Sequence, residues 1–244
     1  MVIYFEQIDS TNRVAKELVR EGKPSGTVVW AGKQSSGKGQ YGRIFVSPAG
    51  GLYFSLLLQP PLQLEHLSQV TLATGLACRD IIYSFCHLQS QIKWPNDIYL
   101  GEKKVAGILC ENVILNSAEK TVPIVVIGMG INVNNTVDAF PIETQPIVTT
   151  LFEHFKVKIE IEELLLSLVT AITQKVLSLG ADRQGIFEQW QRHDYLFGKK
   201  VKYSTGQTTW HGIGCGITPE GFYRIKDSHG IEHPIVGGQL RLQQ

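Results

Sequence analysis

The chain has 244 residues, of which 43% are hydrophobic and 18% are charged, and its formal net charge is +1. This length can bury a sizeable core and suits one domain plus a small appendage. The near-neutral charge argues against non-specific DNA binding and against a polybasic membrane surface, so we expect neither nucleic acid nor membrane as a partner.

Targeting signals are absent from the sequence pattern. No apolar run approaches the roughly 20 residues of a membrane span, and the first residues are neither basic nor long enough for a signal peptide. The four cysteines show no Cys-x-x-Cys spacing, and the seven histidines form no metal-binding pattern. The cysteine spacing favours reduced, buried thiols and a cytoplasmic location.

The N-terminal segment reads as a strand at 3–8 followed by a helix. Asp9-Ser10-Thr11-Asn12 offers N-caps, and apolar residues follow at helical spacing. Capping alone is the simpler interpretation of Ser10 and Thr11. The functional alternative is that their hydroxyls, with the free backbone N–H groups of a helix start, bind a polar ligand.

A glycine-rich loop, residues 34–43, follows a strand at 27–31. Its glycines match the dinucleotide pattern G-x-G-x-x-G, but that pattern opens a helix, whereas residues 43–48 read as extended. No Gly-Lys-Ser/Thr ends the loop, so it is not a Walker A sequence. We interpret it as a flexible loop whose Lys38 and Arg43 can close over an anion, with an ordinary surface loop as the alternative.

The central part of the chain combines apolar strands with one long helix. We predict strands at 51–58, 91–100, 103–112 and 123–133, and a helix at 67–85 whose apolar stripe faces the core. Gly128 and Gly130 weaken the last of these strands, which fits a ligand that closely approaches the backbone.

Lys93 and Lys104 stand out because they lie in or beside these apolar strands, with Asp97 between them. A buried ammonium needs an anionic partner, although a lysine at a strand end more often reaches to water. The pair suggests a site for a phosphate-bearing ligand. Because side chains alternate along a strand, we expect Lys104 to share a face with Ala106 and Ile108, and to face the site if they do.

The sequence changes in character after about Asp194. Before that residue, helices are predicted at 149–155, 161–179 and 185–192. After it, short strands with glycine-containing turns are predicted at 199–204, 208–217, 222–226 and 231–242. Such strands predict a small all-β module, most simply a barrel. We therefore divide the chain into residues 1–194 and residues 195–244.

Five motifs together resemble the biotin protein ligase family over nearly the whole chain. They are Asp9-Ser-Thr-Asn12, the glycine loop, Lys93-Trp-Pro-Asn-Asp97, Lys104-Val-Ala-Gly-Ile-Leu109 and Gly128-x-Gly-Ile-Asn132. The resemblance implies an α/β (α+β) catalytic domain with a mixed or antiparallel sheet and flanking helices, plus a C-terminal SH3-like barrel. Bifunctional members carry an N-terminal DNA-binding domain; here the catalytic domain begins almost at Met1, so we expect no repressor activity.

The resemblance also implies a reaction and its partners. Biotin and ATP would form biotinyl-5′-AMP and pyrophosphate with the help of Mg²⁺. The biotinyl group would then pass to a lysine of a biotin carboxyl carrier protein domain, expected to be that of acetyl-CoA carboxylase. Some relatives pair through sheet edges, so a homodimer is one option.

Site residues follow from the resemblance in three groups. Lys104, Lys93 and Lys38 would be catalytic, with Lys104 between the biotin carboxylate and the α-phosphate. The biotin-binding set would be Ser10, Thr11, Asn12, Gln34, Lys38, Gly39, Gln40, Lys104, Gly107, Leu109, Gly128 and Met129. The ATP-binding set would be Gly37, Lys38, Arg43, Phe45, Lys93 and Asn132, and Asp97 would help to hold Mg²⁺.

The glycine loop departs from the family pattern Gly-Arg-Gly-Arg-x-Gly-Arg-x-Trp at three positions. Lys38 and Gln40 replace the first two arginines, and Phe45 replaces the tryptophan. Lysine keeps the charge but loses the bidentate fork, glutamine loses the charge, and phenylalanine offers a smaller aromatic face. We expect the chemistry to survive and the intermediate to leak faster than from a loop with arginine at position 40.

Two rival functions remain at this stage. A lipoate ligase or lipoyl transferase has a related fold, but those families favour an Arg-Arg-x-x-Gly-Gly-Gly signature that is absent here. A non-catalytic biotin or nucleotide sensor would be expected to have lost an active-site lysine, whereas Lys93 and Lys104 are both present.

Overall fold

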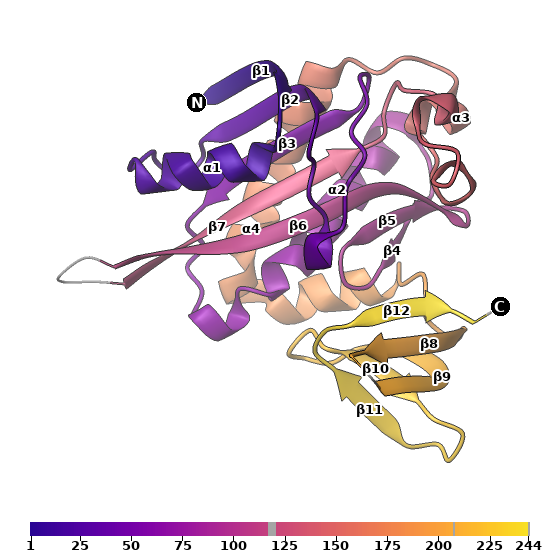
Figure 1. Cartoon of the computed structure of the whole chain (residues 1–244). Helices are drawn as coiled ribbons and strands as arrows, with labels where there is room; N and C mark the ends of the chain where they lie inside the picture. The colour runs from indigo at the N-terminus through magenta and orange to yellow at the C-terminus, as the bar shows by residue number, and fades with distance from the viewer. Residues whose placement is uncertain (117–120, 207, 244) are drawn as a thin grey trace.

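The computed structural model describes residues 1–116, 121–206 and 208–243, which form a larger and a smaller unit (Figure 1). The larger unit holds the strands β1 (Val2–Ile8), β2 (Val28–Gln34), β3 (Leu52–Leu58), β4 (Gln91–Lys93), β5 (Asp97–Leu100), β6 (Lys103–Asn116) and β7 (Thr121–Ile131). Its helices are α1 (Thr11–Arg20), α2 (Gln69–Cys86), α3 (Leu151–Phe155) and α4 (Ile161–Gln191). The smaller unit holds β8 (Lys200–Thr205), β9 (Thr208–Ile217), β10 (Tyr223–Lys226), β11 (Glu232–Ile235) and β12 (Gln239–Leu242).

The two sheets confirm the predicted fold class. The seven strands of the larger sheet run in the order β1-β2-β3-β7-β6-β5-β4, with β1 parallel to β2 and antiparallel pairs elsewhere. The five strands of the smaller sheet are all antiparallel, in the order β11-β10-β9-β8-β12, as expected of the small barrel. The boundary between residues 194 and 195 stays a prediction.

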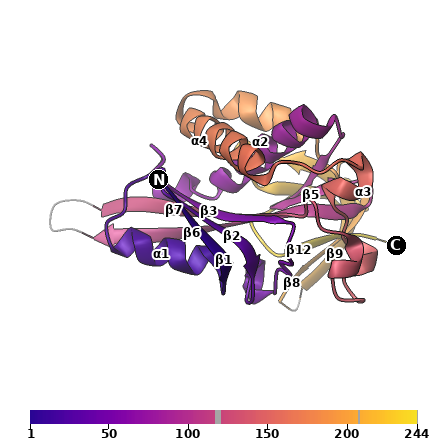
Figure 2. The same cartoon turned by 90° about the horizontal axis from the view of Figure 1, so that it is seen from above.

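Helices cover both faces of the larger sheet (Figure 2). One face packs against α2 and α4 through a large apolar cluster that includes Phe54, Ile108 and Met129. The opposite face packs against α1 through a smaller cluster that includes Ala15 and Val19. Alternation along the strands therefore decides which side chains enter the main core and which lie on the α1 face.

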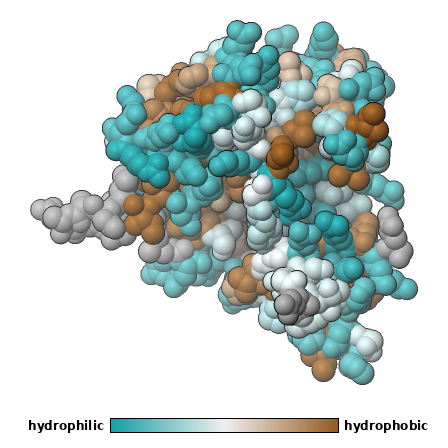
Figure 3. Space-filling model, viewed as in Figure 1, coloured by the Kyte–Doolittle hydropathy of each residue, from teal (hydrophilic) through white to brown (hydrophobic). Residues whose placement is uncertain are grey.

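The helix α4 is long and apolar enough, by length and composition, to cross a membrane. Its residues Leu164, Leu168, Ile172 and Val176 are buried in the large cluster, so it serves as a core helix. On the outside, hydrophobic residues are scattered among hydrophilic ones on the face shown in Figure 3.

Two predicted strands differ from the structure, whereas two predicted helices are confirmed. The strand expected at 91–100 is two strands, because Pro95 in the connecting turn has no N–H to donate to a ladder. The helices expected at 161–179 and 185–192 are confirmed as two helical segments of α4, which meet at Asp182, where φ is −135° and ψ is 45°. Oδ1 of Asp182 accepts from the N–H of Gly185 (3.1 Å) and so caps the second segment. The strand expected at 231–242 breaks into β11 and β12 at a turn where Gly238 has φ +102°.

The small barrel is fixed to the larger unit by contacts of Trp94 and Tyr223. The indole N–H of Trp94 donates to the carbonyl of Gly221 (3.2 Å), and the two rings of Trp94 and Tyr223 lie 5.7 Å apart. The hydroxyl of Tyr223 donates to Oδ2 of Asp194 (2.7 Å). Trp94 belongs to the Lys93–Asp97 motif, so the barrel packs directly against a motif of the predicted site.

Candidate active site

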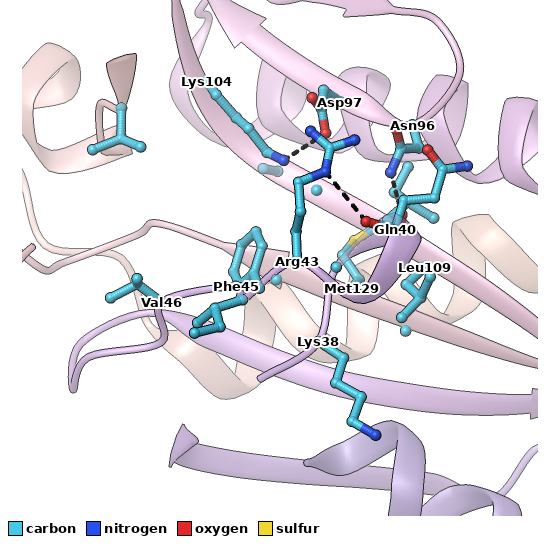
Figure 4. Close-up of a pocket in the computed structure, with 18 of the residues that line it drawn as sticks. Lys38, Gln40, Arg43, Phe45, Val46, Asn96, Asp97, Lys104, Leu109 and Met129 are labelled. Atoms are coloured by element: carbon cyan, nitrogen blue, oxygen red, sulfur yellow. Dashed lines mark hydrogen bonds and ion pairs between the residues drawn. The ribbon is translucent and has the colours of Figure 1, made fainter. Parts of the chain in front are cut away.

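A cavity of about 650 Å³ opens in the larger unit, and the barrel contributes Arg241 to its lining (Figure 4). Its wall comes from the start of α1, the loop after β2, the strands β5, β6 and β7, the segment 144–148 and β12 of the barrel. Every predicted site residue except Gly37 lines it. One end is lined by the polar side chains of Ser10, Thr11, Asn12 and Gln34, and the other carries several cations.

The polar end is built around the N-terminus of α1. Ser10 caps the helix by accepting from the N–H of Arg13, so its predicted capping role is confirmed, and it also lines the cavity. The N–H of Thr11 donates to Oε1 of Gln34 (2.8 Å), and the Thr11 hydroxyl lies 3.2 Å from the same atom. Helix α1 and the start of the glycine loop are thereby held together.

Asn12 is engaged by neighbouring protein groups. Its amide donates to the carbonyl of Leu109 (3.2 Å) and to Oε2 of Glu111 (2.8 Å), and its Oδ1 accepts from Ser55 (2.6 Å). The prediction missed Ser55, although a single serine in the otherwise hydrophobic run 52–58 was a usable signal. Asn12 and Ser55 thus shape this end of the cavity through hydrogen bonds to each other and to β6.

The glycines of β7 leave room for side chains of the protein itself. A Cβ at Gly128 would collide with the amide of Asn12, and one at Gly130 would collide with the ring of Phe45. Close approach therefore explains both glycines, as predicted, but the approaching groups are Asn12 and Phe45. Met129, between them, borders the cavity, but it is 3% exposed and packs in the large core cluster.

The cationic end centres on two lysines and one carboxylate. Nζ of Lys104 lies 2.5 Å from Oδ1 of Asp97. Nζ of Lys93 lies 3.4 Å from the hydroxyl of Tyr99. Burial lowers the pKa of Lys93; Asp97 opposes this effect, and the nearby cations, including Lys104, add to it.

Lys104 reaches the cavity through a β-bulge that strand alternation did not predict. In β5 and β6, Tyr99 pairs with Lys104 but Ile98 pairs with Ala106, which leaves Val105 as an extra residue. Ala106 and Ile108 therefore point into the main core, and the prediction that Lys104 shares their face was wrong. A Cβ at Gly107 would lie 2.9 Å from Nζ of Lys104, so these two share the cavity face.

The glycine loop places its polar residues in different directions. Gln40, Arg43 and Phe45 line the cavity, and the guanidinium of Arg43 donates to the carbonyl of Gln40 (3.3 Å). The Phe45 ring centroid lies 5.4 Å from Nζ of Lys104. Lys38 also lines the cavity, but its ammonium points away from Lys104 and Asp97 (Figure 4).

Asn132 offers a free acceptor inside the cavity. Its Nδ2 donates to the carbonyl of Thr149 (2.9 Å), while its Oδ1 is buried and has no hydrogen-bond partner within the described ranges. A buried, unpartnered oxygen of this kind can accept a hydrogen bond from an ordered water or from a bound ligand. The exocyclic amine of a purine base is one donor that fits.

Arg241 is a cavity residue that the sequence prediction did not include. It lies on β12 of the barrel, lines the cavity, and adds to the lowering of the Lys93 pKa, after burial and Lys104. Short alternating strands fix which side chains face inward only once their register is known. With Arg43, Lys93 and Lys104, this arginine gives the cavity an excess of positive charge over the carboxylate of Asp97.

Asp97 stands alone as a candidate metal ligand. Among residues 1–116, 121–206 and 208–243, no group of three or more His, Cys, Asp or Glu side chains could hold a metal ion. A cation held here would therefore need most of its ligands from water and from substrate oxygens.

Comparisons with known proteins agree with this geometry. Residues 4–132 match the model of the biotin/lipoate A/B protein ligase family. The chain is 33% identical over 233 residues to the bifunctional ligase/repressor BirA of Bacillus spizizenii, covering 95% of this chain and 71% of the relative. It is 32% identical over 220 residues to the biotin–[acetyl-CoA-carboxylase] ligase of Paracoccus denitrificans, covering 87% of this chain and 89% of the relative.

A solved structure extends the similarity to the whole fold. The biotin protein ligase from Aquifex aeolicus, in complex with biotin and ATP, superposes with a TM-score of 0.85 at 30% sequence identity. The match covers 100% of this chain and 98% of that one, so both the larger sheet and the small barrel are shared.

Proposed function

The chain belongs to the biotin/lipoate A/B protein ligase family as a biotin protein ligase, and we propose that its cavity joins biotin to ATP and then passes biotin to a carrier lysine. The observation that supports these roles most strongly is the two-ended cavity. An end lined by the polar side chains of Ser10, Thr11, Asn12 and Gln34 adjoins an end with an excess of cations, which suits a neutral ureido ring at one side and a triphosphate at the other.

Biotin lies with its ureido ring at the α1 end. Ser10, Thr11 and Gln34 supply hydroxyl, amide and backbone groups for the ring's carbonyl and N–H groups. Asn12 and Ser55 hold this end in shape through the hydrogen bonds described above. The biotin carboxylate then points towards Lys104.

The first step brings two anions together. A carboxylate oxygen of biotin attacks the α-phosphorus of ATP, the new carbon-bound oxygen–phosphorus bond forms, and the bond to pyrophosphate breaks. Lys104 lies between the carboxylate and the α-phosphate and offsets their repulsion, while Lys93 and Arg241 bind the outgoing phosphates. Such placed charges typically contribute about 3–4 kcal/mol each, or roughly 10²–10³ in rate.

The adenine base is held at the side of the cavity that faces residues 144–148. Oδ1 of Asn132 accepts from the exocyclic amine, and Phe45 provides an aromatic face. Arg43 and the loop N–H groups lie over the phosphate and ribose. The loop thereby separates the mixed anhydride from water.

Asp97 is the residue that would hold Mg²⁺. One carboxylate fits this ion, because Mg²⁺ in nucleotide sites is commonly bound by one or two carboxylates plus phosphate oxygens and water. When bound, the ion neutralises phosphate charge. An anion that draws Lys104 away from Asp97 frees the carboxylate for this role.

The second step needs no nucleophile from the enzyme. The neutral amine of a carrier lysine attacks the carbonyl of biotinyl-5′-AMP, the amide bond forms, and AMP leaves. The relative in Paracoccus denitrificans supports the carrier domain of acetyl-CoA carboxylase as the acceptor. The four free cysteines support a cytoplasmic location.

A labelling assay tests the proposal. Purified protein is incubated with ATP, Mg²⁺, a biotin carrier domain and either biotin or lipoate. The mass of the carrier domain is then measured by mass spectrometry. We expect biotin-dependent pyrophosphate release and a carrier that gains one biotinyl group. Transfer of lipoate in place of biotin, or no pyrophosphate release with either acid, would overturn it.

A further inference from the structure

Tyr41 of the glycine loop contacts the small barrel at Gly238, and neither residue is among those that line the cavity. The hydroxyl of Tyr41 accepts from the N–H of Gly238 (2.7 Å) and lies 3.5 Å from the Gly238 carbonyl. We propose that Tyr41 is a positioning residue, whose hydroxyl holds the loop against the barrel turn 236–238 and so lengthens the retention of biotinyl-5′-AMP. This inference rests on the proposed function, because retention concerns its intermediate.

The backbone of Tyr41 indicates that the contact is held by its surroundings. Tyr41 has φ 59° and ψ 33°, a left-handed conformation that is rare for a bulky residue. Its side chain is 58% exposed, so burial does not account for its placement. Such backbone strain persists where other interactions fix the segment, and the hydrogen bond to Gly238 is one that does so.

The barrel side of the contact is a fixed point. Gly238 has φ +102°, and its Cα lies so close to Tyr203 of β8 that a Cβ would be 2.6 Å from the ring. The barrel itself is attached to the catalytic unit through Trp94 and through the Tyr223–Asp194 hydrogen bond. The hydrogen bond between Tyr41 and Gly238 therefore links the glycine loop to the larger unit by way of the barrel, in addition to the loop's own chain connections.

On the loop side of the contact, residues close to Tyr41 line the cavity. Tyr41 lies between Gln40 and Arg43, which both line the cavity, and the Arg43 guanidinium lies 5.8 Å from the Tyr41 ring centroid. Arg241 follows Gly238 by three residues and lines the cavity from the opposite unit. One hydrogen bond thus sets the distance between two segments that each present an arginine to the phosphates.

The variant Tyr41→Phe removes the hydroxyl and keeps the ring beside Arg43. We expect biotinyl-5′-AMP to leave the enzyme roughly 2- to 10-fold faster, the effect of losing one net hydrogen bond. The KM for ATP should rise by a similar factor, whereas the Kd for biotin without ATP should not change, because Ser10, Thr11 and Gln34 lie at the other end. Release is followed by a chase experiment with labelled biotin.

Tyr4→Phe is the matched control. Tyr4 is a similarly exposed tyrosine, 54% exposed, on the edge strand β1, and its hydroxyl makes no hydrogen bond within the residues that the structure describes. It should release the intermediate at the wild-type rate. Limited trypsin cleavage after Lys38 and Arg43 gives a readout without substrates, and Tyr41→Phe should be cut faster than the control.

A second variant breaks the contact from the barrel side. Gly237 does not have a positive φ, and a Cβ there would lie 3.3 Å from the Tyr41 hydroxyl, so Gly237→Leu displaces it. The single variants and the double variant should then share one phenotype without adding. Wild-type release rates and wild-type trypsin cleavage in both single variants would overturn the inference, whereas loss of pyrophosphate release in the wild type would count against the proposed function instead.

Discussion

Nζ of Lys104 lies 2.5 Å from Oδ1 of Asp97, at the point in the cavity where an attacking carboxylate and a phosphate would meet. Both side chains are partly exposed, at 28% and 20%, so water and a bound anion can reach them. A biotin carboxylate must compete with Asp97 for the lysine. The ion pair therefore links the binding of biotin to the release of a carboxylate that Mg²⁺ can use.

Asp97→Asn separates these two roles of the carboxylate. Without the competing charge, we expect the Kd for biotin in the absence of ATP to fall about 2- to 5-fold, the usual range for a partly exposed ion pair. We expect pyrophosphate release to slow by at least about tenfold, because the proposed Mg²⁺ ligand is lost. Calorimetry and a phosphate-release assay measure the two quantities, and equal losses in both would contradict the separation.

Lys93 gives the ATP affinity a predictable pH dependence. Burial lowers its pKa below the usual 10.5, so its positive charge is present at low pH and is lost as the pH rises through the lowered pKa. The KM for ATP should therefore rise with pH before 10.5 is reached. In Lys93→Arg the side chain stays charged, so the slope should disappear; identical slopes in both proteins would contradict the role of Lys93.

Gln40→Arg restores a charge to the cavity wall that the family loop carries. Gln40 lines the cavity, and a guanidinium there can make a charge-assisted hydrogen bond to a phosphate oxygen. We expect biotinyl-5′-AMP to be released about tenfold more slowly than from the wild type. Gln40→Lys provides a control with the charge but without the fork, and release as fast as from the wild type in both variants would refute the expected leakage.

Asp194 predicts how stability changes with pH. Burial raises its pKa to about 6, against an unfolded value of 3.8, despite hydrogen bonds from Leu196 and Tyr223. Because the folded state binds this proton more tightly, the contribution of Asp194 to the free energy of unfolding is full below pH 3.8 and is lost as the pH rises through about 6. At about 1.4 kcal/mol per pH unit, the loss amounts to about 3 kcal/mol. Urea unfolding of wild type and Asp194→Asn between pH 4 and 7 should show this difference, and parallel profiles would contradict it.

The fold was largely predictable because its signals are local. Apolar periodicity located α2 and most strands of the larger sheet, and turn residues located the barrel strands. The exceptions have local causes that pattern alone does not reveal. Pro95 interrupts a strand whose apolar residues continue on both sides, and Gly238 lies in a turn that divides the strand expected at 231–242.

The site was predictable in its membership and less so in its geometry. Lys104 reaches the cavity because Val105 is an extra, bulged residue of β6. Without the bulge, strand alternation would place Lys104 on the same face as Ala106 and Ile108, which pack in the main core. Whether an extra residue is accommodated depends on pairing with β5, which is a tertiary property. Arg241 was left out of the predicted site because the register of the barrel strands was not fixed by the sequence, and the packing of the barrel brings it to the cavity.

The neighbouring lysines of β6 provide the most direct test of the central role given to Lys104. Lys103 is exposed and is not among the cavity residues, whereas Lys104 pairs with Asp97 inside it. The measurement is single-turnover formation of biotinyl-5′-AMP by Lys104→Ala and Lys103→Ala with saturating biotin and ATP. We predict a loss of about 10²–10³-fold for Lys104→Ala and the wild-type rate for Lys103→Ala; formation at the wild-type rate by Lys104→Ala would contradict the assigned role.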